Sequence, residues 1–133
     1  MIAVDTNVLI RLMVEDDAAQ AKRVRQLLDR SEEQDELALV SDIVLCELDW
    51  VLRSAYRVPR VRVLAALTDL SADPRFRFED PGRVSTALDL FQQGKADLAD
   101  YLVGLTAESA GARTTYTFDR ELRGDPRFTM VAA

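Results

Sequence analysis

Histidine is absent from this chain of 133 residues, and cysteine occurs only once, as Cys46. Without histidine there is no Ser-His-Asp or Cys-His catalytic group, no histidine-ligated zinc and no histidine general base. A single cysteine excludes an internal disulfide, so we expect the protein to work in the reducing cytoplasm. No apolar run approaches the roughly 18 residues that a membrane-spanning helix requires. We also expect no secretory leader, because the chain starts directly with a predicted strand.

The composition is that of an ordinary globular protein, with 48% hydrophobic and 30% charged residues. We expect one domain over residues 1–133, large enough to bury a core without disulfides. The net charge is −6, from 23 acidic and 17 basic residues. An acidic average disfavours nucleic-acid binding, unless the carboxylates gather to hold cations or the basic residues are grouped.

Strand and helix patterns alternate along the chain. Apolar and β-branched runs predict strands at Ile2–Val4, Leu37–Val40, Phe76–Phe78, Thr114–Phe118 and Phe128–Val131. The spacing of apolar residues predicts helices that begin near Val8, Glu15, Ile43, Val61, Pro81 and Ala96. The polar segment Ser31–Glu36 is interpreted as a solvated loop. This order predicts an α/β fold with more helix than strand, in which helices cover both faces of a short, mostly parallel sheet of about four or five strands.

Two aspartates follow predicted strands. Asp5 ends the first strand, and Asp119 follows the strand at Thr114–Phe118. Because the carboxyl ends of parallel strands lie at one edge of a sheet, we expect these two side chains to meet. An isolated aspartate at position 5, or Asn7 beside it, is more often a simple helix cap. Three further acidic residues favour a functional role for Asp5.

Glu47 lies in the middle of an apolar stripe on its predicted helix. Its neighbours three and four positions away are all apolar: Ile43, Val44, Trp50 and Val51. A carboxylate is costly to bury unless it is paired or bound to a metal. We therefore favour a functional Glu47 over a glutamate that reaches solvent. Asp49 faces Arg53 at i+4 and is interpreted as a surface pair worth roughly 0.2–0.5 kcal/mol.

Asp97 and Asp100 stand one turn apart near the start of the last predicted helix. Asp97 is also a sound N-cap, and Asp100 also suits the helix dipole, so each residue alone leaves both interpretations open. Carboxylates that converge with Asp5, Glu47 and Asp119 in a partly desolvated cleft would repel one another strongly. Hard cations such as Mg²⁺ or Mn²⁺ relieve such repulsion, whereas zinc and copper favour ligands that the chain lacks. One or two such ions activate water for in-line hydrolysis of a phosphodiester.

Four segments resemble a PIN domain, in particular the ribonuclease toxin of a VapBC-type, type II toxin–antitoxin pair. They are AVDTNVLIRL, SDIVLCELDWVL, ADLADYLVGLTAESAG and TFDREL, and they occur in the expected order and spacing. The resemblance covers essentially the whole chain and implies a PIN-like three-layer α/β/α sandwich. It also implies Mg²⁺- or Mn²⁺-dependent cleavage of RNA, a homodimer, and neutralisation by a small antitoxin that covers the cleft. Because a cleft rich in carboxylates attracts arginine, we expect that antitoxin to carry a basic segment.

The resemblance also assigns roles to individual residues. It implies acidic metal ligands at Asp5, Glu47, Asp100 and Asp119, with Asp97 as a supporting residue or a further ligand. The polar residues that match the family, expected to hold carboxylates or water in place, are Thr6, Asn7 and Thr117. Tyr101 stands where a small residue is common, so we expect it to narrow the cleft beside the metal.

Basic residues are grouped after Glu47. Arg53, Arg57, Arg60 and Arg62 lie within ten residues, with Tyr56 among them and no acidic residue. This group fits equally well a patch that grips phosphates while a base stacks on Tyr56, or a solvated, arginine-rich helix end. Cys46 is expected to pack as a small apolar residue, and Trp50 to lie in the core or at a dimer interface.

Other functions fit the residues less well. A haloacid-dehalogenase-like phosphatase needs a second aspartate where Asn7 stands, and a response-regulator receiver needs an acidic pair and a strand lysine that are not visible. The remaining alternative is a catalytically inactive PIN-like module that binds protein or RNA, and the complete carboxylate set argues against it. The sequence does not encode which RNA is cut.

Overall fold

The computed structural model describes residues 1–14 and 16–132. The chain folds into two compact units, residues 1–81 and residues 82–133. Glu15, which was expected to open a helix, lies outside the described residues. None of the described helices is long and apolar enough to cross a membrane.

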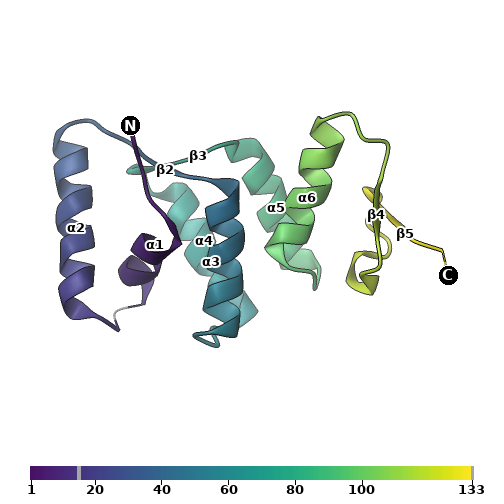
Figure 1. Ribbon diagram of the computed structural model, residues 1–133, viewed down its shortest axis with the longest axis horizontal. Coiled ribbons are helices and arrows are strands. Elements are labelled where there is room, and N and C mark those ends of the chain that lie inside the picture. Colours follow the sequence, from purple (N-terminus) through teal and green to yellow (C-terminus); the bar gives the residue numbers. More distant parts are fainter. Residues whose placement is uncertain (15, 133) are drawn as a thin grey trace. The chain divides into compact units, whose positions relative to one another are not determined.

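The first unit contains a three-stranded parallel sheet (Figure 1). Its strands are β1 (Ile2–Ala3), β2 (Ala38–Val40) and β3 (Phe76–Phe78), paired in the order β1-β2-β3. The register places Ala38 opposite both Ile2 and Phe76. Phe76 and Phe78 are buried while Arg77 between them is exposed, which confirms the alternation expected of a short strand.

Four helices complete the first unit. They are α1 (Thr6–Met13), α2 (Ala18–Glu33), α3 (Asp42–Ser54) and α4 (Arg60–Ala72). Side-chain oxygens of Asp5, Asp17 and Ser41 accept backbone N–H bonds at the starts of α1, α2 and α3. The apolar faces of the four helices meet in a core. Its fully buried side chains include Leu9, Leu28, Leu45, Leu48, Val63 and Leu67.

The second unit contains two helices and a two-stranded parallel sheet. Its elements are α5 (Pro81–Gln93, beginning at the unit boundary), α6 (Leu98–Ser109), β4 (Thr115–Thr117), the short 3₁₀ helix η1 (Arg120–Leu122) and β5 (Phe128–Met130). Gly111, with φ of +92°, follows α6 and allows the chain to leave the helix in the left-handed conformation. Gly104 lets α6 approach β5 closely, because a Cβ there would lie 2.6 Å from the Phe128 ring.

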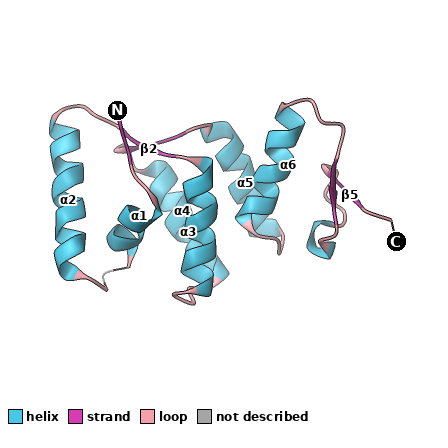
Figure 2. Ribbon diagram, in the orientation of Figure 1, coloured by secondary structure: helices cyan, strands magenta, loops and turns pink. Residues whose placement is uncertain are grey.

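The expected α/β class with small parallel sheets is confirmed, and helix exceeds strand among the described residues (Figure 2). The described strands form two hydrogen-bonded sheets, of three and two strands, where one short central sheet was expected. The prediction of a loop over Ser31–Glu36 is wrong for the first half of that segment. There, α2 continues to Glu33, because Ser31 is buried on the inner face of that helix.

Candidate functional site

Asp5 lies where β1 ends and α1 begins. Its carboxylate Oδ1 accepts a hydrogen bond from the Val8 backbone N–H at 3.2 Å, while the residue remains exposed. Thr6 is buried at 8% exposure and Asn7 is exposed. Asp5 therefore does cap the helix, and this role leaves its second oxygen able to accept a ligand, because a carboxylate has two oxygens.

Two acidic residues not singled out from the sequence follow the other strands of the same sheet. Asp42 is the second residue after β2, and Glu79 comes directly after β3. The carboxyl ends of these parallel strands lie at the edge where Asp5 follows β1. The Asp42 backbone N–H donates to Glu79 Oε1 at 2.8 Å, so Glu79 helps to begin α3. Their place after predicted strands was the available signal in the sequence.

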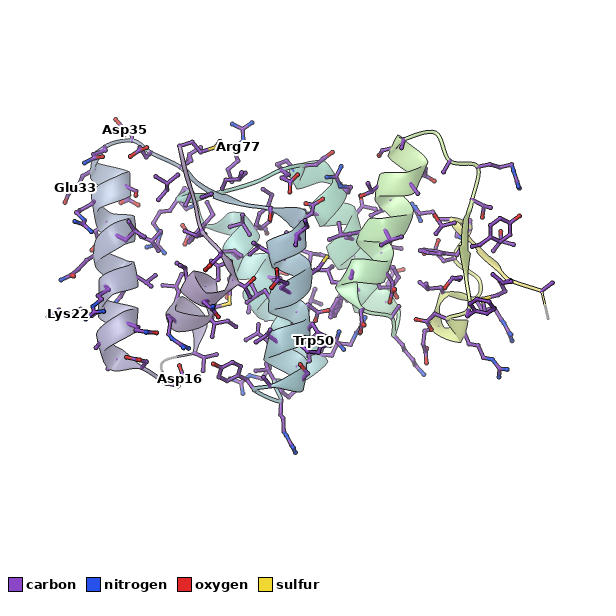
Figure 3. All side chains as sticks on the ribbon, viewed as in Figure 1. Asp16, Lys22, Glu33, Asp35, Trp50 and Arg77 are labelled. Atoms are coloured by element: carbon purple, nitrogen blue, oxygen red, sulfur yellow. The ribbon has the colours of Figure 1, made fainter. Side chains whose placement is uncertain are left out.

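Glu47 is exposed on α3, not buried in an apolar stripe as expected. Its neighbours Ile43 and Trp50 are 71% and 63% exposed, and Trp50 projects from α3 to the surface (Figure 3). The buried face of α3 is formed by Leu45, Leu48, Asp49 and Leu52. The helix thus has two apolar faces, and the one rich in leucine packs into the core. The expected burial of Glu47 is therefore wrong, and Trp50 is not a core residue.

Asp49 is only 1% exposed, so its expected position at the surface is wrong. The predicted partner is correct: Arg53 Nε and Nη2 donate to the two Asp49 oxygens at 2.7 and 2.8 Å. A buried carboxylate needs such a charge-assisted, bidentate pair to offset its desolvation. Two donors of the Arg53 guanidinium are therefore used within α3.

The other residues of the arginine-rich segment have different environments. The Tyr56 hydroxyl donates to Asp16 Oδ2 at 3.1 Å and accepts from Arg11 Nη1 at 3.4 Å. Arg57 is exposed at a left-handed φ of 54°, and Arg60 is the first residue of α4. Their expected contact with RNA stays a prediction, and the bonds of Tyr56 fix its ring to the loop between α1 and α2.

Asp97 and Asp100 form a capping box at the start of α6. The Asp97 backbone N–H donates to Asp100 Oδ2 at 3.1 Å, and the Asp100 backbone N–H donates to the Asp97 carbonyl at 3.0 Å. The structural interpretation of both residues as helix-starting groups is therefore correct. The hydrogen bond from the Asp97 backbone N–H also fixes the orientation of the Asp100 side chain.

Asp119 follows β4 and begins η1. Its Oδ1 accepts from the Glu121 backbone N–H at 2.9 Å, and its own N–H donates to Thr117 Oγ1 at 3.0 Å. Thr117 thus holds the backbone of Asp119, and its expected role in holding carboxylates or water stays a prediction. Asp119 has the same local geometry as Asp5: it follows a strand, and a backbone N–H orients its carboxylate.

The charges of Asp97 and Asp119 act on the half-buried Asp100. Desolvation by burial is the main cause that raises the pKa of the Asp100 carboxyl above its usual range. The hydrogen bond from the Asp97 backbone opposes this shift, and the negative charges of Asp97 and Asp119 add to it. The ionised form of Asp100 is therefore less favourable than that of a solvent-exposed aspartate.

Tyr101 does not stand beside Asp100 as a side chain that narrows a cleft. It is 4% exposed, and its hydroxyl accepts from the Ala96 backbone N–H at 3.3 Å. The hydroxyl fills the space next to Gly94, where a Cβ would clash with it. Residues 100 and 101 point in different directions from α6, so the larger side chain belongs to the core of the second unit.

Comparison with known families decides the class of protein. The model of the PIN domain matches residues 2–124, nearly the whole chain. The chain belongs to the PIN domain family. No curated protein matches the sequence. PIN domains are generally metal-dependent nucleases, so membership indicates a nuclease and implies contact with RNA.

The acidic residues of this PIN domain fit a hard divalent cation in their chemistry. They offer only carboxylate oxygens, the chain has no histidine, and its one cysteine is Cys46. Burial and the smaller effect of two neighbouring negative charges raise the pKa of Asp100, and a bound cation opposes both effects. In the described part of the chain, no three acidic or thiol side chains form a group arranged to hold a metal ion. The assignment of metal ligands therefore remains a proposal.

Proposed function

We propose that this PIN domain is an Mg²⁺- or Mn²⁺-dependent endoribonuclease, with Asp5, Glu47, Asp97, Asp100 and Asp119 as its acidic ligands. The observation that carries the proposal is the arrangement around Asp100. This carboxylate is half-buried, its orientation is fixed by a backbone N–H, and it lies within the field of two further aspartates. Burial is the main cause that raises the pKa of this carboxyl, and the two neighbouring negative charges add to it. Such a carboxylate with a perturbed pKa is typical of a functional site and is stabilised in its ionised form by a bound cation.

The fold orients these carboxylates before any ligand binds. Backbone N–H groups hold one oxygen each of Asp5, Asp100 and Asp119. Each carboxylate keeps a second oxygen whose direction is thereby set. Asp5, Asp100 and Asp119 would hold a divalent ion through these oxygens, and the ion would supply water activation and charge stabilisation for phosphodiester hydrolysis. Fixed ligands need little reorganisation when the substrate arrives, which favours the transition state.

We further propose that the enzyme is the toxin of a type II toxin–antitoxin pair, acting as a homodimer in the cytoplasm. The resemblance of the four acidic segments to VapC-type toxins supports this role. The cognate antitoxin is proposed to carry a basic segment that covers the carboxylates, because opposite charge selects and orients such a partner. An antitoxin that binds equally well after its arginines are replaced would contradict this part of the proposal.

The test of the nuclease is cleavage of a pool of structured cellular RNA by the purified full chain. We expect discrete cuts with Mg²⁺ or Mn²⁺, none with chelator, and a loss of roughly 100-fold or more in Asp100→Asn. Asp89→Asn, the same change at an exposed position of α5, is the matched control and should cut normally. Cuts that persist in Asp100→Asn, or no cuts with either metal, would overturn the proposal.

A further inference from the structure

A buried tyrosine lies directly after Asp100 on α6. Tyr101 is 4% exposed, and its hydroxyl accepts a hydrogen bond from the Ala96 backbone N–H at 3.3 Å. Ala96 is 3% exposed, so the bond is shielded from water. A buried backbone N–H that loses its partner destabilises the folded chain. The loop before α6 therefore depends on this one hydroxyl group.

That loop is held at two consecutive backbone N–H groups. The first, of Ala96, donates to the Tyr101 hydroxyl. The second, of Asp97, donates to Asp100 Oδ2 at 3.1 Å. The Asp100 N–H in turn donates to the Asp97 carbonyl at 3.0 Å. The bond to Tyr101 thus fixes the backbone immediately before the pair of aspartates that begins α6.

Gly94, directly after α5, makes room for the hydroxyl. A Cβ at this position would clash with the hydroxyl oxygen of Tyr101 and would lie 3.1 Å from the ring carbon that carries it. The left-handed φ values belong to Gly111 and Gly124, so the backbone at position 94 does not itself require a glycine. Space for the Tyr101 hydroxyl is therefore the reason for a glycine there.

We propose that Tyr101 is a positioning residue for Asp97 and Asp100, which it holds in the geometry that binds the divalent cation. It acts through the Ala96 N–H and does not touch the ion. The inference rests on the proposed function, in which both aspartates are ligands. Groups that orient the ligands of a metal are worth roughly 10- to 100-fold in metal affinity. A tyrosine that only filled the core would act through its ring, which phenylalanine retains.

Tyr101→Phe removes the hydroxyl and keeps the ring. In the metal-free protein we expect the amides of Ala96 and Asp97 to exchange with solvent about tenfold faster, because a lost hydrogen bond is worth roughly that factor. Hydrogen-exchange NMR measures both rates. Tyr116→Phe, the same change at a 60% exposed tyrosine of β4, should leave them unchanged. An unchanged rate at Asp97 in Tyr101→Phe would overturn the proposal, whether or not the protein binds metal.

Calorimetric titration of the full chain with Mn²⁺ measures the effect on the metal. We expect Tyr101→Phe to bind Mn²⁺ roughly tenfold more weakly. Gly94→Ala displaces the same hydroxyl from Ala96 and should weaken binding by a similar factor. The double variant should bind no more weakly than either single variant, because both changes break one hydrogen bond. Losses that multiply in the double variant would contradict action through this bond.

Val84→Ala is the control for a loss of stability alone. Val84 is a fully buried side chain near the start of α5, whereas the Tyr101 hydroxyl lies beside Gly94, after the end of that helix. Truncation of a buried side chain leaves a cavity, so this variant should melt at a lower temperature. It should nevertheless bind Mn²⁺ like the unaltered protein. Equal Mn²⁺ affinity in Val84→Ala and Tyr101→Phe would overturn the proposal.

Rates of RNA cleavage over a range of Mn²⁺ concentrations separate positioning from support of the fold. Tyr101→Phe should require about tenfold more Mn²⁺ for its half-maximal rate, with a normal maximal rate and an unchanged KM for RNA. A lower maximal rate with an unaltered Mn²⁺ requirement would overturn the role of Tyr101 alone. An unaltered chain that neither binds Mn²⁺ nor cuts RNA would overturn the proposed function, and the role of Tyr101 with it.

Discussion

Single residues in this protein combine structural and proposed chemical roles. Asp5, Asp100 and Asp119 each accept a backbone N–H at the start of a helix or 3₁₀ turn. Capping and metal binding are therefore not alternatives here, because the cap uses one carboxylate oxygen and orients the other. Glu47 has no such setting, since it lies exposed on the side of α3.

Asp100→Asn is expected to raise the thermal stability of the metal-free protein at pH 7. The raised pKa of Asp100 means that the folded state binds the proton more tightly than the unfolded chain. Its stabilising share is complete below the unfolded pKa, near 3.9, and is lost as pH rises through the folded pKa. The asparagine keeps an acceptor for the Asp97 N–H and never ionises.

Melting curves in chelator at several pH values measure this effect. The melting temperature of Asp100→Asn should exceed that of the unaltered protein at pH 7, and the difference should shrink as pH approaches 4 or less. Asp89→Asn serves as the control and should show no pH-dependent gain. A variant that melts lower than the unaltered protein at pH 7 would show that the charge on Asp100 is not costly.

The helix α3 contains a buried ion pair between Asp49 and Arg53. Asp49 is buried among leucines and is tolerated because Arg53 binds both its oxygens. Asp49→Ala removes the carboxylate and leaves the partly buried Arg53 without this partner. We expect a loss of about 1–3 kcal/mol in the free energy of unfolding, measured by urea denaturation. Asp89→Ala, on an exposed helix surface, should change it by less than about 0.5 kcal/mol.

The contact between α6 and β5 depends on the glycine at position 104, which has no side chain. A Cβ at Gly104 would lie 2.6 Å from the Phe128 ring, too close for both to keep their positions. Gly104→Ala is therefore expected to destabilise the protein by about 1–3 kcal/mol, despite the better helix propensity of alanine. In the Phe128→Leu background the same change should cost clearly less. An equal cost in both backgrounds, by urea denaturation, would mean that the ring is not the obstacle.

At the scale of the whole molecule, the ends of the strands were the features that could be predicted best from the sequence. Asp5 and Asp119 were correctly placed after parallel strands, because an apolar or β-branched run that stops at an acid is visible in the sequence. The two strands belong to different sheets, where one sheet was expected, and neither β1 nor β4 contains a buried residue. The leucine-rich face of α3 and the face with Ile43 and Trp50 were not distinguishable, since both are largely apolar and only packing decides which is buried. For the same reason Glu47 was expected to be buried and is exposed, whereas Asp49 was expected at the surface and is buried. Tyr101 was misjudged because its partner, the space beside Gly94, exists only in the folded chain.

Direct binding of Mn²⁺ tests the central claim, that the acidic residues of this PIN domain hold a catalytic divalent cation. The measurement is calorimetric titration of the full chain and of Asp5→Asn, Asp119→Asn and Asp89→Asn. We predict that the first two variants each bind Mn²⁺ at least about tenfold more weakly, while Asp89→Asn binds like the unaltered protein. Equal Mn²⁺ affinity in all four proteins, or no binding by the unaltered chain, would contradict the account.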